Sequence, residues 1–428
     1  MGVLKSGISD RQWDKALAGL EKTGNRLTCP SREALTRACQ QIADEYGFGK
    51  AVESVIALSR KLGFLIADPQ VDSLRTLEIP LPDSRAVCRL EANPNRAHRG
   101  DVKTLIERGI INPEADNESW MYEKWPNGCL GHSRPLSDGD RGWGKNQPGA
   151  IKCFLCSGLG EGRENPVNPN EIFISCPGPD GVIHAGCNFA ALAPCHMTTF
   201  TSASTQQRVD GATPGRTLAI LDALQKDCDP AKPPFTVIHN GDLACRIDED
   251  GKVKMIGAGA TLMHDHNQFM RADLPILHAA VRESTSCCGV KTGVVDWPSS
   301  MIRLEAPAGA RQRLLSRTHT VIRNWQQQHS QNTANLIATS AGDDTVLLIA
   351  LRRVGMADAP GKTCVASLEQ SGIIVLDDMN VFEKYVAASP AERLAYLRTV
   401  LESVDPVFAD ARGDPDKRLQ TLRETMGV

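Results

Sequence analysis

Two histidines and a glutamine alternate within the segment "GAGATLMHDHNQF", residues 257–269. Every second side chain of a β-strand lies on one face, so His264, His266 and Gln268 would point together and Asp265 would point away. The small residues before them offer backbone NH groups that a phosphate can approach closely. An imidazole beside such a loop could act as a general base or as a nucleophile for a phosphoryl or nucleotidyl group. The spacing also leaves open a metal-binding or merely polar strand edge.

A second pattern with chemical potential is the pair Cys153 and Cys156 in "KCFLCSG". The chain has 14 cysteines and no secretion signal at its start, so we expect reduced thiols, most of them in the core. A C-x-x-C pair can supply two thiolates to one zinc ion. A turn with two buried thiols is the other interpretation. The adjacent Cys287 and Cys288 are expected to be two unrelated thiols.

The overall composition is that of an ordinary globular protein, with 41% hydrophobic and 23% charged residues among 428. The formal net charge is only -3, which argues against nucleic acid or an anionic membrane as the main partner. No apolar run has the length of a membrane span, and the first residues lack the apolar core of a signal peptide. We therefore expect a cytoplasmic protein that contains two or three structural units.

The elements that must position these residues follow from hydrophobic periodicity. Residues 8–65 have the spacing of helices, and a long segment rich in Gly, Pro and Trp occupies residues 113–150. A first strand-rich part contains "EIFISC", "HMTTFTS", "FTVIHN" and "KVKMIG", with one helix at "GRTLAILDALQKD". A second part has the helix "RQRLLSRTHTVIRNWQQQHS", the strands "TANLIATS", "TVLLIALRR", "CVASL" and "SGIIVL", and the helix "SPAERLAYLRTVLESV". This uneven, hairpin-like alternation predicts an α+β fold with antiparallel sheets and flanking helices.

Four motifs in the right order carry a family resemblance. H-x-H-x-Q resembles the active-site motif of the histidine-triad (HIT) superfamily branch that includes galactose-1-phosphate uridylyltransferase and the dinucleoside-polyphosphate and nucleoside-diphosphate-sugar phosphorylases. "CFLC" resembles the zinc-binding C-x-x-C of the uridylyltransferases. "NFAALAPCHMTTFTSAS" resembles the segment with a proline-X-histidine, and "FTVIHNGD" resembles the strand that ends in an asparagine beside the phosphates. The resemblance covers roughly residues 86–390.

The resemblance implies two HIT-like halves preceded by a helical segment. The C-terminal "NLIATSAGDDTVLLIALRR" and "SLEQSGIIVL" are similar to the second half of the phosphorylase-type members. The domain division that follows is an N-terminal helical segment at 1–85, a catalytic half at 86–275, and a second half with a C-terminal helix at 276–428.

The resemblance also implies roles for individual residues. His266 matches the nucleophile that is transiently nucleotidylated, and Gln268 matches the residue that hydrogen-bonds the covalent phosphate. Three residues match phosphate contacts, namely Asn240, Gly259 and Thr261. Four residues match the zinc ligands of the uridylyltransferases, namely Cys153, Cys156, His196 and His264.

Two features depart from the family pattern. Asp265 stands where the family usually has proline, so the backbone between the histidines is less restrained and a carboxylate lies nearby. The C-terminal half lacks the family's later histidine-rich stretch, which weakens the case for galactose 1-phosphate as the substrate.

Three cysteines could replace His196 as a zinc ligand, namely Cys176, Cys187 and Cys195.

The predicted reaction is a two-step displacement on a nucleotide or nucleotide-sugar substrate. Neutral His266 attacks the α-phosphorus of a nucleoside-diphosphate compound and expels a sugar phosphate or another phosphate. A phosphate-type acceptor, inorganic phosphate or a sugar phosphate, then removes the nucleotide from the histidine. Gln268, the backbone NH groups and a cation would stabilise the charge on the transferred phosphorus group. The candidate cations are Arg96 or Arg99 and Arg352 or Arg353.

Two other activities remain open. Water could hydrolyse the nucleotidyl-histidine, which would make the protein a hydrolase. Small HIT hydrolases, however, usually carry a histidine where Gln268 stands. A zinc-stabilised nucleotide-binding protein without turnover is the other possibility, because Asp265 replaces the family's proline. The N-terminal helices could cover a sheet face or form the surface of a homodimer.

Overall fold

A computed structural model shows the fold of most of the chain. The described segments are residues 29–70, 72–82, 84–96, 171–201, 207–226, 231–247, 253–260, 265–354, 365–376, 378–412 and 414–427, with residues 22–23, 26–27, 134–135, 229 and 356 as short pieces. Cys153, Cys156, Thr261 and His264 lie outside the described residues, as do Arg99 and the segment 141–170.

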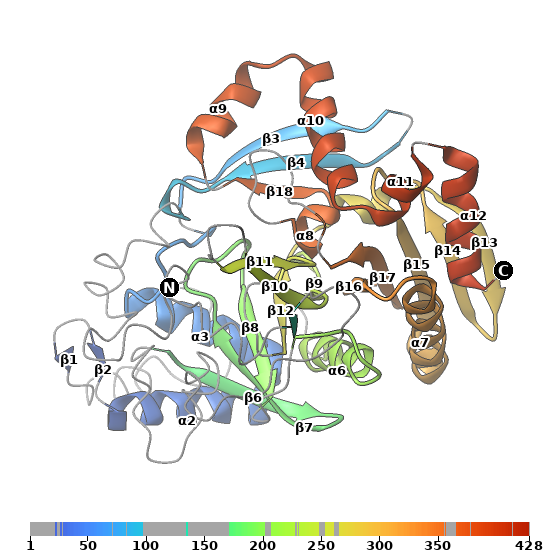
Figure 1. Ribbon diagram of the computed structural model, residues 1–428. Coiled ribbons are helices and arrows are strands. Elements are labelled where there is room, and N and C mark those ends of the chain that lie inside the picture. Colours follow the sequence, from blue (N-terminus) through green and yellow to red (C-terminus); the bar gives the residue numbers. More distant parts are fainter. Residues whose placement is uncertain are drawn as a thin grey trace.

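Among the described residues, ten antiparallel strands form one continuous sheet, here called the main sheet (Figure 1). Their order across the sheet is β13-β14-β15-β17-β16-β9-β12-β8-β7-β6. The strands toward one edge are β6 (Phe173–Gly178), β7 (Gly181–Cys187), β8 (Met197–Thr201), β9 (Phe235–His239) and β12 (His266–Arg271). Those toward the other edge are β13 (Val281–Cys287), β14 (Val290–Val295), β15 (Met301–Pro307), β16 (Asn332–Ala341) and β17 (Asp344–Arg353).

The main sheet consists of two groups of five strands with the same connectivity. Along the chain each group has three strands, a helix and two further strands. The helix of the first group is α6 (Thr213–Gln225), and that of the second is α7 (Arg311–Gln328). The groups meet where β9 pairs with β16 and Ile238 lies opposite Ile337. One chain therefore supplies both halves of a continuous sheet.

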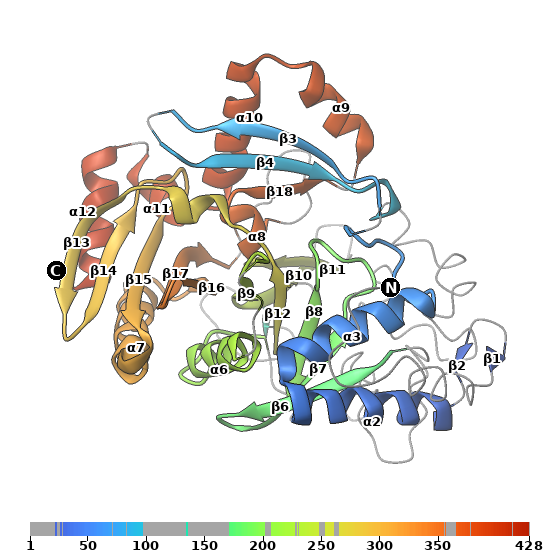
Figure 2. The ribbon, with the colours of Figure 1, turned by 180° about the vertical axis from the view of Figure 1, so that it is seen from behind.

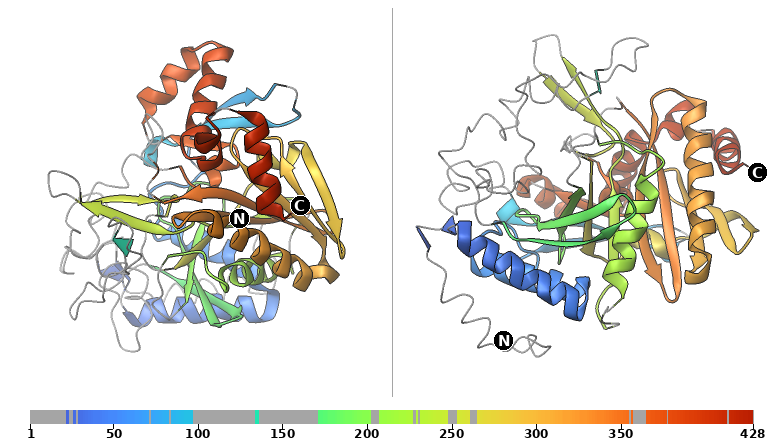
Figure 3. Two further views of the ribbon diagram at one scale, coloured as in Figure 1. Left: turned by 45° about the vertical axis from the view of Figure 1, so that its right-hand side comes forward. Right: turned by 90° about the horizontal axis from the view of Figure 1, so that it is seen from below.

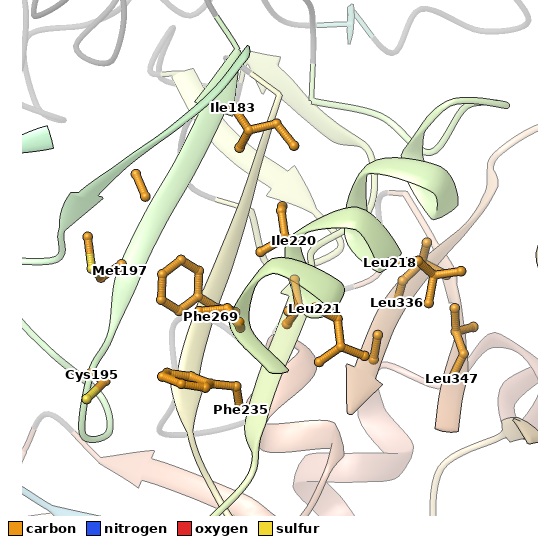
Figure 4. Packing of buried hydrophobic residues seen from close by; sticks show 14 of the residues in the cluster. Ile183, Cys195, Met197, Leu218, Ile220, Leu221, Phe235, Phe269, Leu336 and Leu347 are labelled. Carbon is orange, nitrogen blue, oxygen red and sulfur yellow. The ribbon is translucent and has the colours of Figure 1, made fainter. Parts of the chain in front are cut away.

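Helices cover one face of the main sheet (Figure 2). Besides α6 and α7 these are α2 (Cys29–Tyr46), α3 (Phe48–Lys61), α11 (Pro406–Ala411) and α12 (Pro415–Met426). Their apolar residues share one core cluster with that face. In Figure 4, Phe235 and Phe269 of neighbouring strands pack beneath Leu221 of α6, and their ring centroids are 5.9 Å apart.

The opposite face packs against a smaller three-stranded sheet of order β18-β4-β3. Its strands are β3 (Arg75–Pro80), β4 (Val87–Ala92) and β18 (Ile373–Leu376). The helices α9 (Met379–Ala387) and α10 (Pro390–Ser403) cover it, as the upper part of Figure 1 shows. A capping box of Ser389 and Glu392 starts α10. This second layer forms the other core cluster.

Smaller elements complete the description, and Figure 3 shows them from two further sides. Strands β10 (Leu243–Ile247), β11 (Val253–Gly257) and β5 (Arg134–Pro135) form a small sheet, and β1 (Lys22–Thr23) pairs with β2 (Arg26–Leu27). The short helices are α8 (Ser367–Gln370), η5 (Pro275–His278) and η6 (Ala308–Ala310). Among the described helices, none has the length and apolar content needed to cross a membrane.

The predicted α+β architecture of antiparallel sheets with flanking helices is confirmed. Two parts of the prediction are wrong. The segment "CVASL" was expected to be a strand, and the chain instead enters the helix α8 there. Residues 8–65 were expected to be helical, and the short strands β1 and β2 lie within that range. The predicted boundary after residue 85 falls within the hairpin of β3 and β4. Strand β4 pairs in parallel with β18, so residues 75–92 pack with the C-terminal part of the chain.

Candidate active site

Strand β12 separates its side chains onto two chemically different faces. Asn267 accepts a hydrogen bond from Thr217 of α6 at 2.9 Å, so it lies on the helix-covered face with Phe269. Gln268 points to the opposite face, where Met270 belongs to the second core cluster. By the same alternation, His266 shares the face of Gln268.

Gln268 is oriented by a buried histidine from the neighbouring part of the sheet. Nε2 of His196 lies 3.0 Å from Oε1 of Gln268, while Nδ1 accepts a hydrogen bond from the backbone N–H of Leu192 at 3.0 Å. Because Nδ1 is an acceptor, the proton of the neutral ring resides on Nε2 and is donated to the amide oxygen. The NH₂ group of Gln268 is then the end that can donate to a phosphate oxygen.

Burial keeps this histidine neutral. His196 is 1% exposed. Burial lowers its pKa to about 3, the hydrogen bond with Gln268 opposes that shift, and the charge of Arg96 adds to it. A charged imidazole would donate from both nitrogens and so could not accept from Leu192. The neutral ring is thus the form that fits both contacts.

The observed contacts of His196 do not fit its predicted role as a zinc ligand. Metal ligation needs a ring nitrogen with a free lone pair, yet Nδ1 accepts from Leu192 and Nε2 donates to Gln268. The three alternative cysteines, Cys176, Cys187 and Cys195, all belong to the apolar core. Burial raises the pKa of each thiol, to about 12 for Cys176 and about 11 for Cys195. Within the described segments, no group of three possible metal ligands is present.

Two predicted phosphate contacts lie against a segment from the second half of the chain. The Oδ1 atom of Asn240 accepts hydrogen bonds from the N–H and hydroxyl groups of Ser367, at 3.0 and 2.7 Å. Its amide nitrogen is therefore the end available to donate. Gly259 has a φ of +101°, and a Cβ there would lie 2.6 Å from Ala366, so only glycine fits. Asn240 and Gly259 thus meet at residues 366–367.

The predicted cations lie in three different settings. Arg96 is 4% exposed, donates to the carbonyl oxygen of Ala190, and lies near enough to His196 to lower its pKa. Arg352 is 1% exposed and donates to the carbonyl oxygen of Val365 at 2.7 Å, one residue before Ala366. Arg353 points to the other face of β17.

The surroundings of Arg353 separate it from the candidate site. It donates to both carboxylate oxygens of Asp410 in α11, at 3.0 and 2.7 Å. Consecutive side chains of a strand point to opposite faces, so only one of the two neighbouring arginines can face the site. The structure brings Arg352 to the side of Val365 and Ala366, and it does not bring Arg353 there.

The site also contains residues that sequence reasoning did not single out. Gln207 is 1% exposed, and its Oε1 accepts a hydrogen bond from the backbone N–H of His266 at 2.8 Å. His239, for which no partner was predicted, contacts Asp265 at 2.8 Å. The sequence gives one hint, since a carboxylate in a buried strand requires a cation or donors nearby. It does not say which of 48 Lys and Arg residues supplies them.

Comparison with known proteins supports the resemblance found in the motifs. No protein-family model matches the chain. Its sequence is similar to galactose-1-phosphate uridylyltransferases from Streptococcus salivarius, at 28% identity over 165 residues, and from Streptococcus thermophilus strain CNRZ 1066, at 27% over 165 residues. The match covers 37% of this chain but spans only 29% of the length of these relatives. The predicted resemblance to the uridylyltransferase branch is confirmed by this similarity.

Comparison with solved structures finds yeast Ap4A phosphorylase Apa2 in two complexes. The complex with Ap4A has a TM-score of 0.47 at 13% identity and covers 83% of this chain and 96% of that one. The complex with AMP has a TM-score of 0.46 at 14% identity and covers 83% and 94%.

Proposed function

We propose that the chain is a nucleotidyltransferase or phosphorylase that acts on a nucleoside-diphosphate compound through a nucleotidyl-histidine at His266. The observation that carries the proposal is the geometry of β12. His266 and Gln268 share one face, and the neutral His196 fixes the amide of Gln268 so that its NH₂ group can donate. The similarity to galactose-1-phosphate uridylyltransferases supports the same reaction class.

The proposed reaction has two displacements at one phosphorus atom. In the first, a ring nitrogen of His266 bonds to the α-phosphorus and the bond to the leaving phosphate oxygen breaks. In the second, an oxygen of the acceptor phosphate bonds to the phosphorus and the bond to nitrogen breaks. A side-chain nucleophile divides one difficult transfer into two easier steps. Inorganic phosphate as acceptor gives phosphorolysis, and a sugar phosphate gives transfer.

Hydrogen-bond donors would stabilise the oxygens of the transferred group. Gln268 and Asn240 each have the amide oxygen occupied by a protein donor, which leaves the nitrogen to donate. Fixed donors of this kind act without reorganisation when charge develops on the phosphoryl oxygens. Arg96 is a candidate for the cation, because its charge acts on the neighbouring His196.

The mechanism requires a nucleotide to reach His266, and this residue is only 2% exposed. A nucleotide can reach its ring only if atoms that cover the side chain move aside. We therefore expect the rate of modification of His266 by diethyl pyrocarbonate to be far lower than that of His278, whose side chain is 55% exposed. Addition of a nucleotide should change the rate at which diethyl pyrocarbonate modifies His266.

The decisive test is a panel of nucleoside-diphosphate sugars with intact-mass detection of the protein. A covalent adduct of one nucleoside monophosphate is expected with the right donor, and His266→Gly should abolish it. An adduct that persists in His266→Gly contradicts the proposal. Product that appears only with added phosphate or sugar phosphate indicates transfer, whereas product in water alone indicates the hydrolase. Binding without either indicates the protein without turnover.

We further propose that any zinc bound by the chain is held by Cys153, Cys156 and His264 without His196. The contacts of His196 to Leu192 and Gln268 argue for this division. Zinc content measured after purification should fall in Cys153→Ser and stay unchanged in His196→Ala. Loss of zinc in His196→Ala would restore the ligand set that the family resemblance implies.

A further inference from the structure

Asp265, the residue in the place of the family's proline, is tied to two other elements of the fold. Its Oδ2 lies 2.6 Å from the guanidinium of Arg216 in α6, and its Oδ1 lies 2.8 Å from Nε2 of His239 in β9. Asp265 is only 5% exposed. One carboxylate oxygen is thus within hydrogen-bond distance of each partner.

The backbone of the next residue is anchored separately. The ladder between β9 and β12 extends from Arg271 to Gln268, which lies opposite Ile238. Beyond that pair the side chain of Gln207 lies between the strands. Its Oε1 accepts from the N–H of His266 at 2.8 Å, and its Nε2 donates to the carbonyl oxygen of Asn240. The amide of Gln207 thus replaces a strand partner at the two residues predicted to contact the phosphorus group.

These contacts restrain the backbone at residue 265, where the family's proline would restrain it through its ring. A proline fixes its own φ through its ring, and any other residue at that position leaves this angle to tertiary contacts. Here the carboxylate of Asp265 is held on the helix-covered face, and strand alternation directs the His266 ring to the opposite face. An attacking atom misplaced by about 1 Å can lose about 100-fold in rate, so such a restraint affects catalysis.

We propose that Asp265, held by Arg216 and His239, is the positioning residue that fixes His266 for attack on phosphorus. The proposal rests on the proposed function, because His266 is the nucleophile only if that function is right. It assigns to three side chains the role that a single proline ring has in the family pattern. In this proposal Asp265 acts through the position of His266.

The test compares variants of Asp265 with a variant of another Arg216 partner. Asp180 lies 3.0 Å from Arg216, has a side chain that is 50% exposed, and provides the matched control in Asp180→Asn. With UDP-glucose as the first donor, single-turnover adduct formation should slow about 100-fold in Asp265→Ala and about tenfold in Asp265→Asn, which keeps one acceptor oxygen. Asp180→Asn should stay within about twofold of the unmodified chain. The dissociation constant of the nucleotide should be unchanged in all three variants.

A second measurement does not depend on turnover. Hydrogen–deuterium exchange of the peptide that covers residues 265–271 should be faster in Asp265→Ala than in the unmodified chain, and unchanged in Asp180→Asn. If Asp265→Ala fails to fold, Asp265→Asn carries both measurements. Unchanged exchange and unchanged adduct rates in a folded Asp265 variant would overturn the positioning role. If the unmodified chain forms no adduct with any donor, the proposed function fails, and the exchange result alone decides whether Asp265 fixes the start of β12.

Discussion

The two halves of the main sheet share a strand order but differ in chemistry. Ile238 and Ile337 lie opposite each other where the halves meet, which makes them equivalent positions. Gln268 of β12 pairs with Ile238, and Leu348 of β17 pairs with Ile337. Gln268 and Leu348 are therefore equivalent, one in each half. An amide in the first half corresponds to a buried aliphatic side chain in the second.

The same registers extend the correspondence to the other site residues. His266 lies opposite Phe200, and its equivalent Val346 lies opposite Glu305. Counting along β8 and β15 from that pair makes Met301 the equivalent of His196. Val346, Leu348 and Met301 all belong to the core cluster that packs on the smaller sheet. The second half thus has apolar core residues at the positions where the first half has the candidate site residues.

The second half nevertheless contributes to the candidate site from outside the sheet. Ser367 holds the amide oxygen of Asn240, and Ala366 packs against Gly259. Since one chain supplies all ten strands, a second copy is not needed to complete the sheet, and the predicted homodimer stays a prediction. The two halves thus have the same strand order but different side chains at equivalent positions, with the candidate site residues in the first half and core residues in the second.

The largest expected effect comes from the nucleophile and its counterpart. His266→Ala should slow single-turnover adduct formation by more than about a thousandfold, because in the proposed mechanism the covalent bond forms on the ring of His266. Val346→Ala removes the equivalent side chain and should leave that rate unchanged, while it costs about 2 kcal/mol of unfolding free energy. Adduct mass and urea unfolding measure the two quantities. A large rate loss in Val346→Ala would show that the second half takes part in chemistry.

The next effect concerns the amide at Gln268. Gln268→Ala should lower the adduct rate about 100-fold, as expected for loss of one fixed donor to a charged oxygen. The reciprocal change Leu348→Gln buries an amide among apolar groups and should cost about 1–3 kcal/mol of unfolding free energy without a change in rate. Equal rate losses in both variants would contradict the assignment of chemistry to one half.

Sequence reasoning predicts most of the strands that carry these residues, because period-2 alternation is a local signal. It also places His266 and Gln268 on one face of a strand. It does not predict the strand order, since β9 and β16 pair across about a hundred residues of sequence. The segment "CVASL" was misassigned because a short apolar run does not distinguish a strand from the start of a helix.

The roles of single side chains show the same limit. His196 matches a zinc-ligand motif, but its role depends on Gln268, which is 72 residues away in sequence. For Arg352 and Arg353 a usable signal was present, because adjacent residues of a strand cannot both face one site. Gln207 carries no sequence pattern that could have identified it. Its contacts to His266 and Asn240 exist only once two strands have come together.

A smaller effect is expected from the histidine that orients Gln268. His196→Ala removes the donor to the amide oxygen, so the amide can rotate and the adduct rate should fall about tenfold. Met301→Ala, its counterpart, should leave the rate unchanged but lower the unfolding free energy by about 2–5 kcal/mol. Single-turnover rates and urea titrations compare the two. If His196→Ala abolished the reaction completely, His196 would have to act on the substrate directly.

The smallest effect is expected at Arg353, on the helix-covered face of the second half. Its side chain is 18% exposed and that of Asp410 is 54% exposed, so solvent screens the pair. Arg353→Ala, Asp410→Ala and the double variant should give a coupling of less than about 1 kcal/mol in unfolding free energy. The adduct rate should stay within twofold of the unmodified chain, about 0.4 kcal/mol in activation free energy. Arg353 was one of the cations predicted from sequence to contact phosphate. A larger rate loss with unchanged stability would therefore place phosphate binding on the helix-covered face. Such a result would contradict the distinction between the two halves.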